Sequence, residues 1–309
     1  TLLMNHRLEP TVCLDQVSVW AEQAKAVAAQ GQVNQRILRL AHSDPAWFAV
    51  QIEGQSGAVC ALGDTERAFS LMSVIKPFLL LYLLEHYGPD KVFSWVGMVP
   101  SELPFNSLEQ LIADGGRPRN PMINSGAIAL AARLPGDNGD DCAQRFCQWL
   151  NQQAGCRLAL DIPLLASVRQ VGRQTNQTLV RHLVKAGQVQ HPELALDVYE
   201  QICCLAGQAG DLARLGRLLA FDSEAALRSN RCAVNALMLT CGLYEASAAY
   251  AVRIGLPMKS GISGALLAVV PGWGAIATYS PALDPVGNPI AGLAFVEQMA
   301  TALRLSRFG

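Results

Sequence analysis

The stretch that decides the fold is Ser73-Val74-Ile75-Lys76, followed at once by the apolar run PFLLLYLLEHY at residues 77–87. Two residues three positions apart lie on one face of a helix, so the Ser73 hydroxyl and the Lys76 amine are expected to be neighbours. A neutral lysine beside a serine can accept its proton and turn the hydroxyl into a nucleophile. With 17 Ser and five Lys in 309 residues, one such pair also arises easily by chance. The motif therefore needs support from its surroundings.

The position of Ser73 in the chain supplies part of that support. It follows two predicted strands at 47–53 and 58–63, and it opens a helix over 73–86. The first turn of a helix offers free N–H groups and the positive end of the helix dipole, which suit an oxyanion. Pro77 fits a first turn because it has no N–H to donate. A residue before proline is biased away from helical angles, however, so a helical Lys76 is a point to check.

A second polar island, Lys259-Ser260-Gly261, contains another of the five lysines. Ser-x-x-Lys early in the chain and Lys-Thr/Ser-Gly on a late strand are the signature of serine β-lactamases and penicillin-binding proteins. The order of the two motifs agrees with that signature. The alternative of two unrelated surface lysines is left open.

Predicted strands lie at both ends of the chain, with a long helical region between them. The late strands are expected at 249–255, 265–270, 275–280 and 290–295, and a helix over 295–306 follows them. This order predicts an α+β fold of the β-lactamase/transpeptidase type, with a mainly antiparallel sheet built from both chain ends. We expect one unit over 1–309, with a sheet subdomain at about 1–72 and 246–309 and an inserted helical subdomain at about 73–245.

Composition excludes several classes of protein. The net charge of −1 argues against a nucleic-acid partner. Nine cysteines without a CxxC pair, and five histidines without ligand spacing, predict no metal site and a reducing, cytoplasmic location. Residues 1–30 contain no apolar signal core, although a leader removed before Thr1 stays open. The uncharged stretch 261–283 is broken by Pro271 and Pro281, so we expect two buried strands there and no membrane association.

Further segments carry a specific resemblance. The run PRNPMINSGAI at 118–128 is joined by PFNS at 104–107, VYEQICC at 198–204, MLTCGLY at 238–244 and GLPMKSG at 255–261. Over roughly residues 17–300 the chain resembles the serine-dependent glutaminases, whose fold is similar to that of the β-lactamases. The resemblance implies hydrolysis of the side-chain amide of L-glutamine to glutamate and ammonia through a Ser-Lys acyl-enzyme, without a cofactor. It also implies a small-molecule amide substrate and a homo-oligomer, either a dimer or a tetramer.

The same resemblance implies a role for each matching residue. Ser73 is the nucleophile and Lys76 its base, and the backbone N–H groups of Ser73 and Ile262 form the oxyanion hole. Tyr199 carries the proton to the leaving ammonia, with Lys259 setting the electrostatics near it. The side chains implied to hold the substrate are Asn124, Asn176 and Tyr244.

Two positions depart from the family pattern. Arg36 stands where the family has a substrate-contacting Tyr, and Arg169 stands where it has the Glu that holds the substrate ammonium. Two like charges 4 Å apart cost up to about 4 kcal/mol at an effective dielectric of 20, so an arginine pointing inward would repel an ammonium. Alternatively, both arginines point away from the pocket and another group takes the ammonium. These departures leave two alternatives open: an amidohydrolase for amides lacking the α-ammonium, and a non-catalytic binding protein descended from a glutaminase. The shared fold leaves a third, a β-lactam-binding or esterase-like enzyme.

Overall fold

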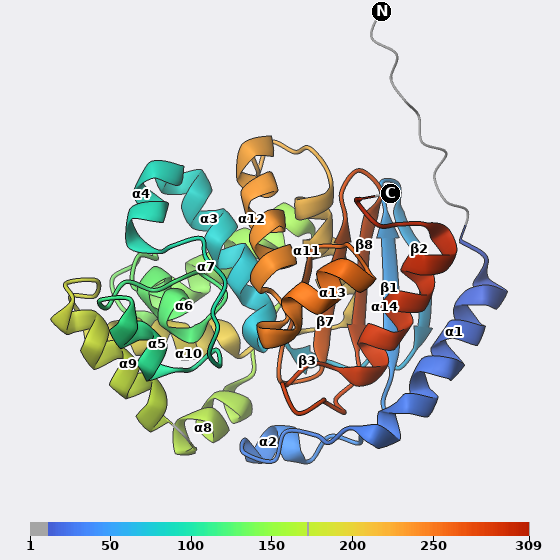
Figure 1. Cartoon of the computed structure of the whole chain (residues 1–309), viewed down its shortest axis with the longest axis horizontal. Helices are drawn as coiled ribbons and strands as arrows, with labels where there is room; N and C mark the ends of the chain where they lie inside the picture. The colour runs from blue at the N-terminus through green and yellow to red at the C-terminus, as the bar shows by residue number, and fades with distance from the viewer. Residues whose placement is uncertain (1–11, 172, 309) are drawn as a thin grey trace, which may run out of the picture.

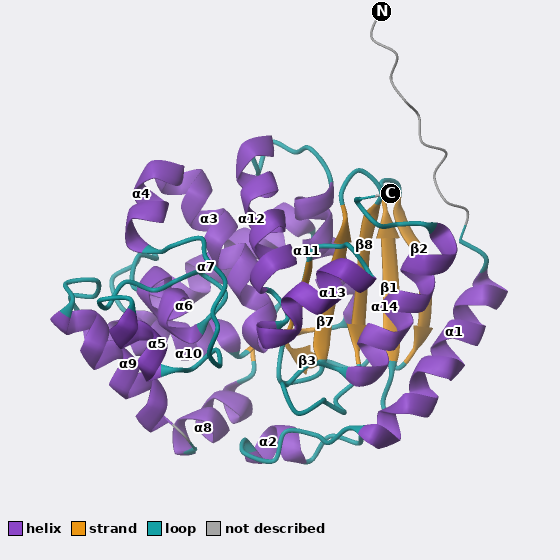
Figure 2. Cartoon of the chain, viewed as in Figure 1, coloured by secondary structure: helices purple, strands orange, loops and turns teal. Residues whose placement is uncertain are grey.

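A single antiparallel sheet joins the two ends of the chain. The computed structural model describes residues 12–171 and 173–308, so the first residues of the predicted sheet subdomain lie outside the described residues. The five strands lie in the order β2-β1-β8-β7-β6, and every neighbouring pair is antiparallel. Figure 2 shows the strands gathered on one side of the molecule and most helices on the other. The strands are β1 (Ala49–Gly54), β2 (Gly57–Gly63), β6 (Met258–Ser260), β7 (Ala265–Val270) and β8 (Gly274–Tyr279).

Both faces of this sheet are covered. Because successive side chains in a strand point to opposite faces, Leu266 and Ala268 lie on the face that α14 (Ile290–Leu303) covers. Helix α1 (Leu14–Val27) packs beside α14 in the same hydrophobic cluster. Leu267 and Val269 pack on the other face against α11 (Ala209–Ala220). Figure 1 shows α1 and α14 side by side over the sheet. Every residue of β1, β7 and β8 is buried as a result.

The helical region is built around one apolar helix. All residues from Lys76 to Leu84 of α3 (Lys76–Tyr87) are buried, which explains why the run at 77–87 has no polar face. The helices that accompany it are α2 (Leu38–Ala41), α4 (Pro89–Trp95), α5 (Leu108–Ala113), α6 (Asn124–Ala131), α7 (Gly139–Ala154), α8 (Ile162–Gln170), α9 (Arg173–Lys185), α10 (Pro192–Cys203), α12 (Arg228–Cys241) and α13 (Ser247–Arg253).

A small second sheet, β3-β5-β4, links the two regions. Its strands are β3 (Phe69–Ser70), β4 (Ala159–Leu160) and β5 (Leu205–Gly207). The N–H of Leu71 donates to the carbonyl of Leu205 just beyond this sheet. The chain segment that enters α3 is thereby fixed to the segment that leaves α10.

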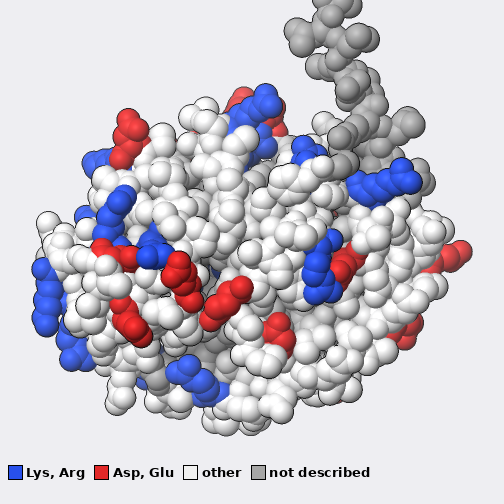
Figure 3. Space-filling model, viewed as in Figure 1, with Lys and Arg blue, Asp and Glu red and all other residues white. Residues whose placement is uncertain are grey.

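The fold confirms the predicted α+β class and the sheet made from both chain ends. The two strands expected within 261–283 are β7 and β8, joined by a turn at 271–273. Two expected strands were wrong: 249–255 belongs mostly to α13, and 290–295 is the first part of α14. The division into subdomains at about residues 72 and 246 stays a prediction. No helix in residues 12–171 and 173–308 is long and apolar enough to cross a membrane. The face shown in Figure 3 is mostly uncharged, and positive and negative side chains are scattered over it.

Candidate active site

Ser73 lies in a tight turn at the entrance to α3. It belongs to the 3-10 helix η2 (Met72–Ile75), which continues directly into α3. Met72, the residue before it, has a φ of 44°, a left-handed conformation that non-glycine residues rarely adopt and that often marks a functional turn. The Val74 N–H bonds to the Leu71 carbonyl, whereas no backbone carbonyl in the described part of the chain accepts the Ser73 N–H, as is usual for the first turn of a helix.

Gly261 lets the end of β6 approach this turn. A Cβ at Gly261 would lie 2.7 Å from the Leu71 carbonyl oxygen and 3.4 Å from the Ser73 nitrogen. Ile262 comes next in the chain, and no backbone carbonyl of residues 12–171 and 173–308 accepts its N–H. The Ser73–Lys76 motif and the Lys259–Gly261 motif therefore meet in the fold, although they are more than 180 residues apart in sequence.

Lys76 is a buried amine, with only 1% of its surface exposed. Its backbone angles are helical (φ −60°, ψ −42°) despite the following proline, so Ser73 and Lys76 share one turn as expected. Their side chains are not hydrogen-bonded to each other, since the acceptors of Lys76 Nζ among the described residues are on Met122 and Asn124. The Nζ atom donates to the Met122 carbonyl at 3.2 Å and to Asn124 Oδ1 at 2.9 Å. Burial lowers the pKa of Lys76 to about 8, so about a tenth of the amine is neutral at pH 7 and the neutral fraction rises with pH.

Asn124 connects the polar groups of the site. It is the first residue of α6, and its Oδ1 accepts from both Lys76 Nζ and the Tyr199 hydroxyl, the latter at 3.0 Å. Its Nδ2 donates to Asn176 Oδ1 at 3.1 Å, which fixes the orientation of the amide. Burial raises the pKa of Tyr199 well above its usual value, so the phenol holds its proton at neutral pH and can act as a donor.

Replacing Asn124 by aspartate is expected to move the pH dependence of the reaction. A carboxylate 2.9 Å from Lys76 Nζ favours the ammonium form and raises the pKa of Lys76 by about 1–3 units. We expect the pH profile of kcat/KM for Asn124→Asp to shift upward by at least about one unit. Asn176→Asp is the comparison. Asn176 bonds to Asn124 and not to Lys76, so this variant should shift the pH profile less. Equal shifts in both variants would contradict this role for Asn124.

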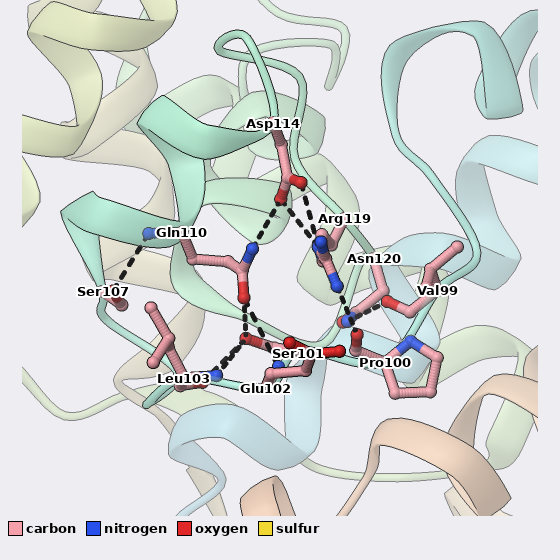
Figure 4. A network of polar contacts seen from close by, with 10 residues as sticks. All are labelled: Val99, Pro100, Ser101, Glu102, Leu103, Ser107, Gln110, Asp114, Arg119 and Asn120. Atoms are coloured by element: carbon pink, nitrogen blue, oxygen red, sulfur yellow. Dashed lines mark hydrogen bonds and ion pairs between the residues drawn. The ribbon is translucent and has the colours of Figure 1, made fainter.

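The PRNPMIN run positions Asn124. Asn120 Oδ1 accepts from the backbone N–H groups of Met122 and Ile123, and Asn120 Nδ2 donates to the Val99 carbonyl at 2.9 Å. Figure 4 shows the neighbouring supports: Arg119 pairs with Asp114, and Gln110 links Asp114 to the 101–103 loop. A turn that is bonded through side chains in this way fixes where α6 begins.

Gly126, in the same motif, is required by close packing. A Cβ there would lie 2.0 Å from the Asn120 carbonyl oxygen, a backbone atom that cannot rotate away. We expect Gly126→Ala to lower the free energy of unfolding by about 2–4 kcal/mol. Gly210→Ala is the matched control, because Gly210 is also helical and its nearest neighbour is the end of the Arg214 side chain at 3.3 Å. Urea unfolding measures both variants, and equal midpoints would contradict the packing argument.

Lys259 lies next to Tyr244 and does not lie over Tyr199. It is completely buried, and its Nζ donates to the carbonyls of Gly242 at 3.0 Å and Ser260 at 2.7 Å. The same nitrogen lies 4.5 Å from the centre of the Tyr244 ring, whereas Lys76 Nζ lies 5.9 Å from that of Tyr199. Burial, with Lys76 nearby, holds the pKa of Lys259 well below its usual value.

The Tyr244 hydroxyl is buried and makes no hydrogen bond with any described residue. Burial raises the pKa of this phenol to about 12, against the opposing effect of the Ser73 and Ser260 hydroxyls beside it. Tyr244 also has a φ of 57°. An unpaired buried hydroxyl next to Ser73 is suited to a substrate atom as its partner.

One cavity collects most of the predicted residues. Ser73, Asn124, Asn176, Tyr199, Ile262 and Arg36 all line it. Arg169 lies outside it: its guanidinium pairs with Asp197 and with Glu200 Oε2. Three further residues line the cavity that no sequence motif marked as functional: Arg173, Glu200 and Cys203. Glu200 and Cys203 follow Tyr199 on α10, so their proximity to Tyr199 was the available signal.

The fold and this cavity define the class: an α+β protein of the β-lactamase-like type, with a serine at the entrance to its central helix. The family model for glutaminases matches residues 31–308. Glutaminase of Synechocystis is 44% identical over 287 residues, which is 92% of this chain and 88% of that protein. The chain belongs to the glutaminase family.

Solved structures agree with this assignment. The probable glutaminase YbaS superimposes with a TM-score of 0.89 and 32% identity, covering 96% of this chain and 99% of its own. Bacillus subtilis glutaminase YbgJ, solved as a covalent complex with 5-oxo-L-norleucine, gives a TM-score of 0.86 at 27% identity, covering 95% and 99%. Among residues 12–171 and 173–308, no cluster of His, Cys, Asp and Glu is arranged to hold a metal ion.

Proposed function

We propose that this protein hydrolyses the side-chain amide of L-glutamine to glutamate and ammonia, with Ser73 as nucleophile and Lys76 as base. The observation that carries the proposal is the shared Asn124 Oδ1, which holds both Lys76 Nζ and the Tyr199 hydroxyl beside the cavity that Ser73 lines. A nucleophile, a base with a lowered pKa and a protonated phenol are the groups that amide hydrolysis needs.

In the acylation step, Ser73 Oγ attacks the amide carbon while neutral Lys76 takes the hydroxyl proton. The negative charge moves to the carbonyl oxygen, where the N–H groups of Ser73 and Ile262 are free to bind it. The carbon–nitrogen bond then breaks, and the leaving nitrogen takes a proton from the Tyr199 hydroxyl. Tyr199 recovers a proton from the Lys76 ammonium, which leaves an acyl-ester on Ser73 and free ammonia.

Deacylation repeats the same moves with water. A water oxygen attacks the ester carbon and gives a proton to neutral Lys76. The carbon–oxygen bond to Ser73 breaks, and Ser73 Oγ regains the proton. The sum is one amide and one water converted to one carboxylic acid and one ammonia. We assign substrate holding to Asn176 and Tyr244, and maintenance of the Tyr244 environment to Lys259.

The test is a stoichiometric assay of the purified full chain. L-Glutamine is incubated with enzyme, and ammonia and glutamate are measured separately. We expect equal amounts of both, with a kcat in the ordinary enzyme range of about 1–1,000 per second. No ammonia above the uncatalysed rate, from protein with a cooperative unfolding transition, would contradict the proposal.

We also propose that the protein is a cytoplasmic homo-oligomer. All nine cysteines are free, in keeping with a reducing compartment. Several large apolar side chains are exposed, among them Ile162 at 69% and Val252 at 88%, and such surface is suited to contact with a second copy. Light scattering coupled to size-exclusion chromatography is expected to give a dimer or a tetramer, and a monomer at micromolar concentration would contradict this.

A further inference from the structure

The charged residues that line the cavity are two arginines and one glutamate: Arg36, Arg173 and Glu200. Two cations and one anion give the lining a net charge of +1. The other polar lining side chains, such as Asn34, Asn106 and Thr175, are neutral. The site therefore presents more positive than negative charge to whatever part of a substrate lies beyond the amide.

Glu200 is already engaged by two guanidinium groups. Its Oε1 accepts from Arg173 Nε at 2.8 Å, and its Oε2 accepts from Arg173 Nη2 at 3.0 Å and from Arg169 Nε at 3.2 Å. The residue is only 2% exposed, whereas the Arg173 side chain is 30% exposed. This bidentate geometry holds Arg173 rigidly and neutralises Glu200, so Glu200 acts as the anchor of Arg173 and offers little to a substrate ammonium.

Arg36 differs from Arg173 in having no ion-pair partner. It is exposed, and no carboxylate of residues 12–171 and 173–308 is within ion-pair distance of it. Its guanidinium is thus available to an anionic ligand. Both arginines line the same cavity. Arg173 uses its Nε and Nη2 on Glu200, and the remaining guanidinium N–H groups of the two arginines are donors suited to a carboxylate.

We propose that the protein also hydrolyses ω-amides of dicarboxylic acids that have no α-ammonium, because the cavity recognises the distal carboxylate through Arg36 and Arg173. This inference rests on the proposed amide hydrolysis at Ser73 and adds a second substrate class to it. Glutaramate, the monoamide of glutaric acid, differs from L-glutamine only in lacking the α-ammonium. Its net charge of −1 complements the +1 of the cavity, and it brings no cation to the two arginines.

The experiment compares kcat/KM for glutaramate and L-glutamine with the same enzyme preparation, with Ser73→Ala as the blank. We expect Ser73-dependent ammonia release from glutaramate with a kcat/KM within about tenfold of that for L-glutamine, or above it. A value lower by about 100-fold or more, with L-glutamine turned over normally, overturns this inference and leaves the proposed function intact. Turnover of glutaramate alone supports the inference and overturns the assignment of L-glutamine. Turnover of neither substrate overturns both.

A matched pair of variants tests the carboxylate contact. Arg36→Gln is expected to raise KM for L-glutamine and glutaramate about tenfold with little change in kcat, and to leave the uncharged diamide glutaramide unaffected. Arg39→Gln, three residues further on and outside this cavity, should stay within about twofold of wild type on all three amides. Equal losses on charged and uncharged amides in Arg36→Gln would contradict recognition of the carboxylate.

Discussion

Ser73→Ala is expected to lower kcat/KM for L-glutamine by about 10⁴-fold or more, because no acyl-enzyme can form without the hydroxyl. The folded state should hardly change. Ser73 is buried beside the Tyr244 hydroxyl, and alanine removes only the Ser73 hydroxyl oxygen and leaves the rest of the buried side chain. Steady-state kinetics and the unfolding midpoint are measured together, so that loss of activity is separated from loss of structure.

Ser94→Ala is the control for that substitution. Ser94 lies on α4, is exposed and donates only to the Lys91 carbonyl, so this variant should keep activity within about twofold of wild type. A Ser73→Ala enzyme that retains more than about a tenth of the wild-type rate would contradict the assigned nucleophile.

Lys76→Met is the second substitution with a large expected effect. Methionine keeps much of the buried side-chain volume but cannot take a proton, so we expect a loss of about 10²–10⁴-fold in kcat. The wild-type kcat/KM should rise with pH through an apparent pKa near 8, because only the neutral amine is a base and burial lowers the pKa of Lys76 to that value. Any residual activity of Lys76→Met should lack this rise.

The control here is Lys91→Met, an exposed lysine on α4 beside the Tyr87 ring. It should keep both the rate and the pH profile of wild type. A rise near pH 8 that persists in Lys76→Met would assign the titrating group to another residue and contradict the role of Lys76.

Local sequence patterns predicted the fold where they have one structural interpretation. The uncharged runs before and after Pro271 form β7 and β8 because each is short and bounded by turn residues. The segments 249–255 and 290–295 were misread because a short apolar run fits a strand as well as a buried helix. For 290–295, Pro289 directly before the run was a signal of a helix start, and it is indeed the residue that precedes α14.

In the site, too, features set by neighbouring residues could be predicted from sequence, whereas contacts between distant segments could not. Ser73 and Lys76 share one turn, and Gly261 and Gly126 permit close approaches, all of which short motifs can specify. Arg169 could not be placed from sequence, because its direction depends on Asp197 and Glu200 on another helix. A count of acidic residues near Arg169 in the chain misses Glu200, which folding brings to it from 31 residues away.

Covalent trapping of the nucleophile is the most direct test that Ser73 attacks the substrate. The protein is incubated with 6-diazo-5-oxo-L-norleucine, digested and examined by peptide mass spectrometry, with Ser73→Ala beside it. We predict one 5-oxo-norleucine adduct, formed with loss of dinitrogen, on the peptide that contains Ser73 and none in Ser73→Ala. Burial raises the pKa of the nearby Cys203 thiol to about 11, so this competing group should stay unlabelled. An adduct on Cys203 or Lys76 in active enzyme, with Ser73 unmodified, would contradict the mechanism.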